Sequence, residues 1–312
     1  MKKDNSIAIE VKGLTKRFDS LLAVDSVSFE VYTGEIFGFL GPNGAGKTTT
    51  IRMLTGLLSP DKGDIFIEGK DFSKETMSVK MDMGVIPEFG TVYRDLSSYE
   101  NIILTGKFYG MDKKVLFEKT EFLLKQFDLY EKKDIPVMKF SKGMQQRVNI
   151  ASALVHNPKI LFLDEPTGGL DVQSQRLIKN IIKEMNSNGT TVFLTTHNIE
   201  EANALCDRVA IIDRGKIVVI DAPEKLKSTF RETQSVVAAF DKPVVASLIE
   251  SYLSVKTEKS GDKWRVYTDN PDMLVKKLTR FAEGQGLSFT LLEICGPSLE
   301  DVFVKLTEKG KG

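Results

Sequence analysis

Cysteine is scarce in this chain of 312 residues, which has only Cys206 and Cys295. Neither residue belongs to a CxxC pair or to a Cys/His spacing typical of a zinc site. The sequence therefore excludes a disulfide framework and the common zinc clusters. We expect two reduced thiols in a reducing compartment.

Long hydrophobic runs and an excess of one charge are also missing. Dense apolar runs such as 160–163 and 217–220 are four residues long, whereas about 18 are needed to span a bilayer. The N-terminal segment lacks the apolar stretch of a secretory signal, so we expect the chain to stay where it is made. Lys+Arg 43 against Asp+Glu 43 gives a formal net charge of +0. No overall field would hold such a chain on nucleic acid or on an anionic membrane.

Apolar runs alternate with helical patterns through the first part of the chain. Strands are expected near residues 7–11, 24–31, 36–40, 64–68, 160–163, 191–195, 208–212 and 216–220. Helices are expected near residues 47–57, 112–127, 141–156, 172–186 and 198–205. This alternation predicts an α/β domain with a largely parallel core sheet. A proline turn near 221–224 is expected to close the last hairpin, which divides the chain into domains of residues 1–222 and 223–312.

The second domain shows a different order of elements. Strands are expected at 234–240, 253–258, 263–268 and 287–293, with helices at 243–251 and 271–283 and a final helix from Ser298. The order β-α-β-β-α-β predicts a small α+β domain of the split βαβ, or ferredoxin-like, type. Such a domain could bind a regulatory ligand or brace a dimer. We favour bracing, because no cluster of polar or metal-ligating residues surrounds Trp264.

The strongest chemical signal is a glycine-rich loop between an expected strand and an expected helix. It comprises Gly41, Pro42, Asn43, Gly44, Ala45, Gly46, Lys47 and Thr48, and Thr49 follows. This is the phosphate-loop pattern G-x-x-x-x-G-K-[ST], in which backbone N–H groups and a helix N-terminus surround a phosphate. Lys47 should reach the β- and γ-phosphates, and the Thr48 hydroxyl should ligate Mg²⁺. The alternative is a chance glycine-rich turn.

Two adjacent carboxylates follow a buried strand later in the chain. Asp164 and Glu165 come directly after Ile160-Leu-Phe-Leu163, and α/β sheets place ligands at the C-terminal ends of their strands. We expect Asp164 to hold Mg²⁺ through a water and Glu165 to polarise the attacking water. A strand that merely ends in two acids is the alternative, and the phosphate loop argues against it.

Three further motifs resemble those of the ATP-binding cassette (ABC) ATPases. Phe140-Ser-Lys-Gly-Met-Gln-Gln-Arg147 is similar to the signature motif, Gly168-Gly-Leu-Asp171 to the D-loop, and Thr195-Thr-His197 to the switch histidine. The resemblance covers residues 7 to about 222. It implies the P-loop NTPase fold of an ABC ATPase domain, with an antiparallel β subdomain and a helical subdomain, and it implies binding of ATP and Mg²⁺.

The resemblance also implies roles for individual residues. Two cassettes in this family face head to tail, so Ser141 and Gly143 would contact the γ-phosphate bound by the other cassette, and Asp171 would connect the two sites. His197 would hydrogen-bond the γ-phosphate and stabilise the transition state, unless it is a core histidine. Phe18 matches the aromatic position that stacks on adenine, with core packing as the alternative.

Three positions depart from the family pattern. Glu88 stands where the loop that senses the γ-phosphate usually has glutamine, Lys142 replaces the first signature glycine, and Met144 replaces glutamine. Glu88 could still ligate Mg²⁺, but it adds a negative charge near the triphosphate. We expect function to survive because Ser141 and Gly143 remain.

The family implies an energy-coupling subunit of a membrane transporter. Its partners would be an integral-membrane permease and a second cassette, either identical or paralogous, and it would lie on the cytoplasmic face of the cell membrane through the permease, without binding nucleic acid. Residues 225–312, with their Pro297–Phe303 ending, resemble the C-terminal domain of ATPases from ABC-2-type exporters. Lys47 and Asp164 are 117 residues apart without sustained heptads, which excludes a chromosome-structural ATPase with a long coiled coil. A soluble, ribosome-associated ABC ATPase remains the alternative, although such proteins normally carry two cassettes.

Overall fold

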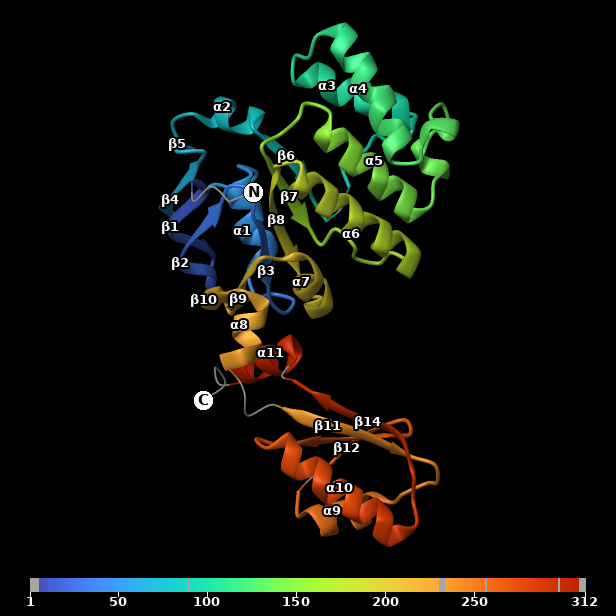
Figure 1. Ribbon diagram of the computed structural model, residues 1–312. Helices are drawn as coiled ribbons and strands as arrows, with labels where there is room; N and C mark the ends of the chain where they lie inside the picture. The colour runs from blue at the N-terminus through green and yellow to red at the C-terminus, as the bar shows by residue number, and fades with distance from the viewer. Residues whose placement is uncertain (1–5, 89, 230–233, 256, 297, 309–312) are drawn as a thin grey trace. The chain divides into compact units, whose positions relative to one another are not determined.

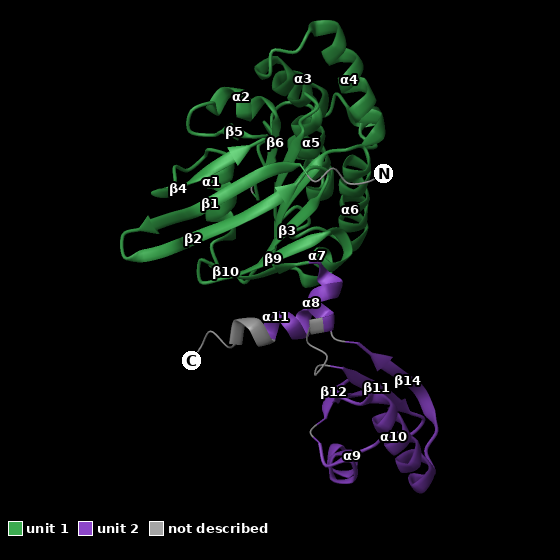
Figure 2. Ribbon diagram, turned by 60° about the vertical axis from the view of Figure 1, so that its left-hand side comes forward, with its two compact units in different colours: residues 1–221 green, residues 222–312 purple. Residues whose placement is uncertain are grey.

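The computed structural model describes residues 6–88, 90–229, 234–255, 257–296 and 298–308. The chain forms two compact units, Met1–Asp221 and Ala222–Gly312 (Figure 2). No helix in the described ranges is both long enough and apolar enough to cross a membrane. Pro297, the first residue of the C-terminal motif, lies outside the described residues.

A mixed six-stranded sheet forms the centre of the first unit (Figure 1). Its strands, in spatial order, are β10 (Lys216–Asp221), β9 (Arg208–Asp213), β3 (Ile36–Leu40), β8 (Thr191–Thr196), β7 (Ile160–Asp164) and β6 (Met83–Ile86). The strands from β9 to β6 run parallel, and β10 pairs antiparallel with β9. All residues of β3, β7 and β8 are buried, because parallel strands are covered on both faces and consist of continuous apolar runs. The C-terminal ends of these three strands therefore meet at one edge of the sheet.

A second, antiparallel sheet shares its core with the first. Its strands are β2 (Leu21–Tyr32), β1 (Ile7–Phe18), β4 (Lys62–Ile67) and β5 (Lys70–Asp71). One apolar core joins both sheets and helix α1 (Lys47–Leu54). The ring of Phe193 lies in this core, with its centroid 5.9 Å from those of Phe29 and Phe37 and 5.7 Å from those of Phe39 and Phe162. Aromatic contacts of this kind stabilise by about 0.5–1.5 kcal/mol each beyond their buried area.

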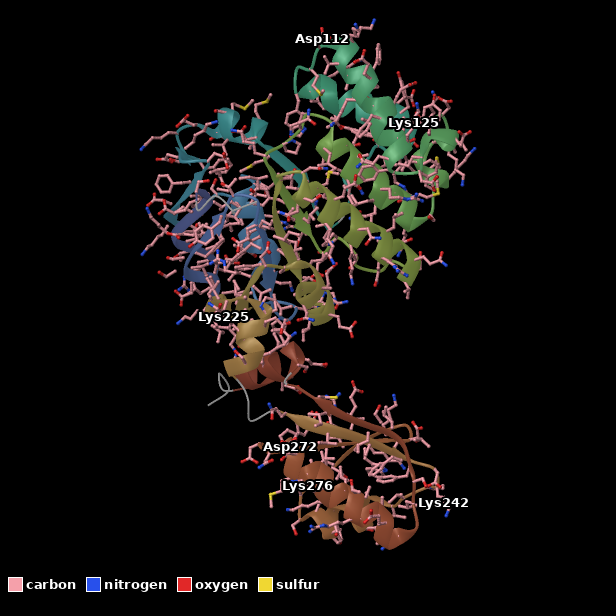
Figure 3. All side chains as sticks on the ribbon, in the orientation of Figure 1. Asp112, Lys125, Lys225, Lys242, Asp272 and Lys276 are labelled. Atoms are coloured by element: carbon pink, nitrogen blue, oxygen red, sulfur yellow. The ribbon has the colours of Figure 1, made fainter. Side chains whose placement is uncertain are left out.

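Three helices gather away from the antiparallel sheet (Figure 1). They are α3 (Ser98–Phe108), α4 (Lys113–Gln126) and α5 (Lys142–Leu154). Ser97 and Glu100 form a capping box at the start of α3, which satisfies N–H groups that the helix leaves unpaired. Asp112 accepts hydrogen bonds from the first turn of α4, and Lys125 lies in its last turn (Figure 3). The negative Asp112 lies at the positive N-terminal end of the helix dipole and the positive Lys125 at its negative C-terminal end, so both charges stabilise α4.

The remaining helices of the first unit connect its strands. They are α2 (Thr76–Met81), α6 (Val172–Ser187) and α7 (Ile199–Leu205), with short 3₁₀ turns η1 (Tyr130–Lys132) and η2 (Val137–Lys139). Asp171 caps α6 and Asn198 caps α7.

The second unit is built on a four-stranded antiparallel sheet with the spatial order β12-β13-β11-β14. Its elements are α8 (Pro223–Thr229), β11 (Ser235–Phe240), α9 (Ala246–Leu253), β12 (Glu258–Ser260), β13 (Lys263–Tyr267), α10 (Pro271–Gln285), β14 (Phe289–Cys295) and α11 (Leu299–Glu308). Trp264 and Val266 of the sheet pack with Leu278 and Phe281 of α10 in a separate apolar core.

Several elements differ from the sequence-based expectations. β6, α2, α3 and β5 were not predicted, and β1 and β2 are longer than predicted. The expected proline turn near residue 223 is instead the start of α8, because proline is well tolerated in the first turn of a helix. The expected strand 253–258 is wrong: α9 continues to Leu253, Ser254 ends it with a left-handed φ of 57°, and β12 begins at Glu258.

A chain that ends at Asp221 should fold by itself, because the two units have separate apolar cores. We expect helical far-ultraviolet circular dichroism and a single cooperative thermal transition, as for an independent domain. An aggregated protein, or one without a cooperative transition, would show that the first unit requires the second.

Candidate functional site

The loop between β3 and α1 has the backbone that a phosphate loop requires. Gly44 and Gly46 have φ values of +81° and +106°, a backbone conformation that residues with a side chain rarely adopt. A Cβ on Gly46 would also lie 2.5 Å from the carbonyl oxygen of Ala23. Gly46 is the N-cap of α1 and offers no capping side chain. Because the first N–H groups of a helix lack partners within it, an anion can bind there.

Lys47, the first residue of α1, is 6% exposed. Its Nζ donates to the carbonyl oxygens of Gly41 at 2.8 Å and Pro42 at 3.3 Å. It also lies 3.5 Å from Oε1 of Glu165. The ammonium group therefore holds the loop closed and joins it to the end of β7.

Asp164 is the last residue of β7 and is 3% exposed. Its carboxylate accepts hydrogen bonds from the hydroxyl groups of Thr195 and Thr48. Burial raises the pKa of Asp164 above its ordinary value, and the neighbouring Glu165 carboxylate adds to this effect, whereas the two hydroxyl groups and Arg52 oppose it. A cation at this carboxylate would favour its charged form.

Glu165 adopts a left-handed backbone with a φ of 50°. Its N–H donates to the carbonyl oxygen of Thr195 at 3.1 Å, which fixes this conformation against β8. Its Oε2 lies 2.8 Å from Nδ1 of His197, directly after β8. The carboxylate thus stands between Lys47 and His197, as a group must if it is to act at the end of a bound triphosphate.

The oxygen atoms of Thr48 and Asp164 are suited to Mg²⁺, which prefers hard oxygen ligands and retains water and phosphate oxygens. Among the residues that the structure describes, no group of three His, Cys, Asp or Glu side chains could hold a metal ion. The oxygens of Thr48 and Asp164 fit an ion that takes its remaining ligands from a nucleotide and water.

Lys47, Thr48, Glu165 and His197 line a cleft of about 1100 Å³, whereas the buried Asp164 does not. Ten of the residues singled out in the sequence line it: Phe18, Asn43, Gly44, Gly46, Lys47, Thr48, Thr49, Glu88, Glu165 and His197. Three residues of the loop do not line the cleft: Gly41, Pro42 and Ala45. The carbonyl oxygens of Gly41 and Pro42 accept from Lys47, and the N–H of Ala45 donates to the carbonyl oxygen of Pro42. The volume is ample for a nucleotide.

Phe18 and Glu88 lie in positions consistent with their predicted roles. Phe18 is 43% exposed, so it is a cleft residue and not a core aromatic. Glu88 is exposed on the cleft wall, which also includes Lys142. Two of the three departures from the family pattern, Glu88 and Lys142, thus place opposite charges in the same cleft.

Ser141, Gly143 and Asp171 do not line this cleft in the described chain. Ser141 caps α5 through a bond from Met144 N–H, and Asp171 caps α6 by accepting from the N–H and hydroxyl of Ser174 at 2.9 and 2.8 Å. Gly143 is buried, and a Cβ there would overlap the side chain of Ser174. The structure therefore brings Gly143 and Asp171 together at Ser174, and all three residues lie outside the lining of the cleft.

Sequence reasoning gave no individual role to several cleft residues, among them Arg94, Asn149 and Gln146, the last of which lies within the signature motif. Gln146 and Asn149 are three residues apart in α5, a spacing that places both amides on one helix face. That spacing was a usable signal, but glutamine and asparagine are also common on solvated helix surfaces.

Two curated proteins are similar to this chain over nearly all of its length. Nod factor export ATP-binding protein I of Ralstonia nicotianae is 36% identical over 301 residues, which cover 96% of this chain and 93% of the relative. Linearmycin resistance ATP-binding protein LnrL of Bacillus subtilis is 32% identical over 304 residues, covering 96% and 98%.

A family profile and solved structures agree with these relatives. The ABC transporter profile matches residues 24–168. The structure of an ATP-binding subunit of an ABC transporter covers 72% of this chain and 93% of its own, with a TM-score of 0.66 and 29% identity. A dimeric ATP-binding cassette in a post-hydrolysis state, bound to ADP and Pi, covers 69% and 98%, with a TM-score of 0.63 and 26% identity. The resemblance inferred from the motifs is confirmed, and the chain belongs to the family of ABC transporter ATP-binding proteins.

Proposed function

We propose that this chain binds and hydrolyses ATP as a subunit of an ABC exporter and couples hydrolysis to substrate movement by a separate permease. The observation that carries the proposal is the position of Glu165, whose carboxylate lies between Lys47 and His197 on the cleft wall. The names of the two relatives, which refer to Nod factor export and linearmycin resistance, support the exporter assignment. These names concern different compounds, so we propose that the permease selects the substrate.

The residues divide the reaction between binding and proton transfer. Phe18 stacks on adenine, and Asn43, Gly44 and Gly46 to Thr49 surround the phosphates. Thr48 and Asp164, assisted by Glu88, would hold Mg²⁺, which would supply positive charge beside the β- and γ-phosphates. Glu165 orients the attacking water and accepts its proton, while His197 contacts the γ-phosphate.

The positions of Ser141, Gly143 and Asp171 support a second cassette as a partner. These residues lie outside the cleft of their own chain, and Ser141 and Asp171 are exposed. In a head-to-tail dimer, Ser141 and Gly143 of one copy meet the γ-phosphate of the other at the N-terminus of α5, where the helix dipole favours an anion. The similar dimeric cassette supports this arrangement.

We further propose that the two units are two domains, an ATPase domain and an accessory domain that braces the dimer. The antiparallel order β12-β13-β11-β14, with α9 and α10 between the strands in sequence, supports a ferredoxin-like type for the accessory domain. The permease would hold the protein at the cytoplasmic face of the cell membrane.

Lys47→Ala should abolish binding of a fluorescent ATP analogue, because it removes the cation over the β/γ-phosphates and leaves Glu165 without that partner. Lys183→Ala, at an exposed position of α6, is the matched control and should bind normally. Undiminished binding by a folded Lys47→Ala protein would refute the phosphate-loop assignment.

Glu165→Gln should retain ATP binding but hydrolyse ATP about 10²–10⁴-fold more slowly, the range expected for loss of a general base. Because ATP then persists between two cassettes, this variant should form an ATP-dependent dimer in gel filtration. Hydrolysis at the wild-type rate would assign the base to another residue.

Glu88→Gln should bind ATP more tightly and need less Mg²⁺, with little loss of turnover, because it keeps an oxygen ligand and removes a negative charge near the triphosphate. Glu88→Ala should lose much of the rate. The measurement is a Mg²⁺ titration of ATPase activity, with Glu118→Gln on the exposed surface of α4 as the control. Superimposable curves for all proteins would show that Glu88 does not act at the nucleotide.

A further inference from the structure

Two side-chain amides of α5 connect two segments of the site that are far apart in sequence. Asn149, 5% exposed, accepts a hydrogen bond from the N–H of Thr91 through Oδ1 at 3.1 Å. Its Nδ2 donates to Oε1 of Gln146 at 3.2 Å. Nε2 of Gln146 donates to the carbonyl oxygen of Pro166 at 3.1 Å. We call Thr91, Asn149, Gln146 and Pro166 the amide relay.

The backbone groups at its two ends fix the direction of the relay. The N–H of Thr91 requires an oxygen, so Asn149 must turn its amide nitrogen towards Gln146. The carbonyl of Pro166 requires a donor, so Gln146 must turn its oxygen towards Asn149. The hydrogen bond from Nδ2 of Asn149 to Oε1 of Gln146 is compatible with both of these orientations. The nitrogen and oxygen positions of both amides are therefore assigned by the hydrogen-bond network. Replacing either amide by a side chain without both a donor and an acceptor breaks the connection.

Each end of the relay lies within three residues, along the sequence, of a residue with a proposed role in hydrolysis. Thr91 follows Glu88 by three residues, and Pro166 directly follows Glu165. Gly90 packs directly on the relay, because a Cβ at this position would overlap the amide of Asn149. Gly90 and Thr91 are thus held against α5, and α5 is held against the segment with Glu165.

We propose that Gln146 and Asn149 are positioning residues for ATP hydrolysis, which set the placement of Glu88 relative to Glu165. Ser141, which would contact the nucleotide of a second cassette, is the N-cap of the same helix. A shift of α5 on contact with a second cassette therefore changes both ends of the relay together. This inference rests on the proposed roles of Glu88 and Glu165. ATP binding should be largely independent of the relay, because Lys47 and its loop are held by β3 and the carbonyls of Gly41 and Pro42.

The test uses uncharged replacements of similar size, Asn149→Leu and Gln146→Met, in the full-length chain. Each variant should lower kcat for ATP hydrolysis about 10- to 100-fold, the loss expected when reacting groups are misplaced by about 1 Å. The Kd of a fluorescent ATP analogue should stay within about twofold of the wild-type value. The double variant should be no slower than the slower single variant, because residues that act as one unit are not additive.

Ser152→Ala is the matched control. Ser152 lies three residues after Asn149 in α5 and is 7% exposed, and its hydroxyl has no hydrogen-bond partner among the residues that the structure describes. This control should match wild type in both kcat and Kd.

Unchanged kcat in the single variants, a parallel loss of ATP binding, or additive losses in the double variant would each overturn the proposal. If Asn149→Leu does not fold, Asn149→Asp provides the same test, because it accepts from Thr91 but cannot donate to Gln146. In that case kcat must fall while the Kd stays near wild type. Glu165→Gln is assayed beside these proteins. Hydrolysis at the wild-type rate by that variant would assign the base to another residue, whereas unchanged kcat in the relay variants beside a slow Glu165→Gln protein would overturn the relay alone.

Discussion

The ammonium group of Lys47 is almost fully buried, and a buried cation must be surrounded by oxygen atoms. Two of these oxygens are carbonyls of its own loop, and a third belongs to Glu165, more than one hundred residues later in the sequence. Satisfying one charge therefore closes the loop after β3 and joins it to the end of β7. Since β8 lies between these strands and supplies His197, the same constraint assembles the cleft wall.

The residues of this wall could be predicted because their chemistry depends on local sequence. Gly44, Gly46 and Lys47 are fixed by backbone conformation and spacing within one loop, and Asp164 and Glu165 by their place after a buried strand. The family resemblance is confirmed, whereas the roles of the individual residues stay predictions.

Other features were not predicted, and several of them depend on distant parts of the chain. β6 has only four residues and becomes a strand by pairing with β7. The capping box of Ser97 and Glu100 was a local signal for α3 that the hydrophobic pattern did not reveal. The contacts of Gln146 and Asn149 with Pro166 and Thr91 require the folded arrangement of three segments. In the second unit the order of elements was predictable, but the end of α9 was not, because Ser254 terminates it in a conformation that serine rarely adopts.

Glu165 combines a left-handed backbone with a side chain that other residues contact. A residue with a side chain in this region costs about 1–2 kcal/mol, whereas glycine adopts it freely and asparagine tolerates it. The backbone alone would thus favour glycine or asparagine at residue 165. The carboxylate, however, is the ion-pair partner of the buried Lys47 and lies against His197. Replacing Glu165 by glycine would relieve the backbone but leave a buried cation with one oxygen fewer, so the two effects oppose each other at one position.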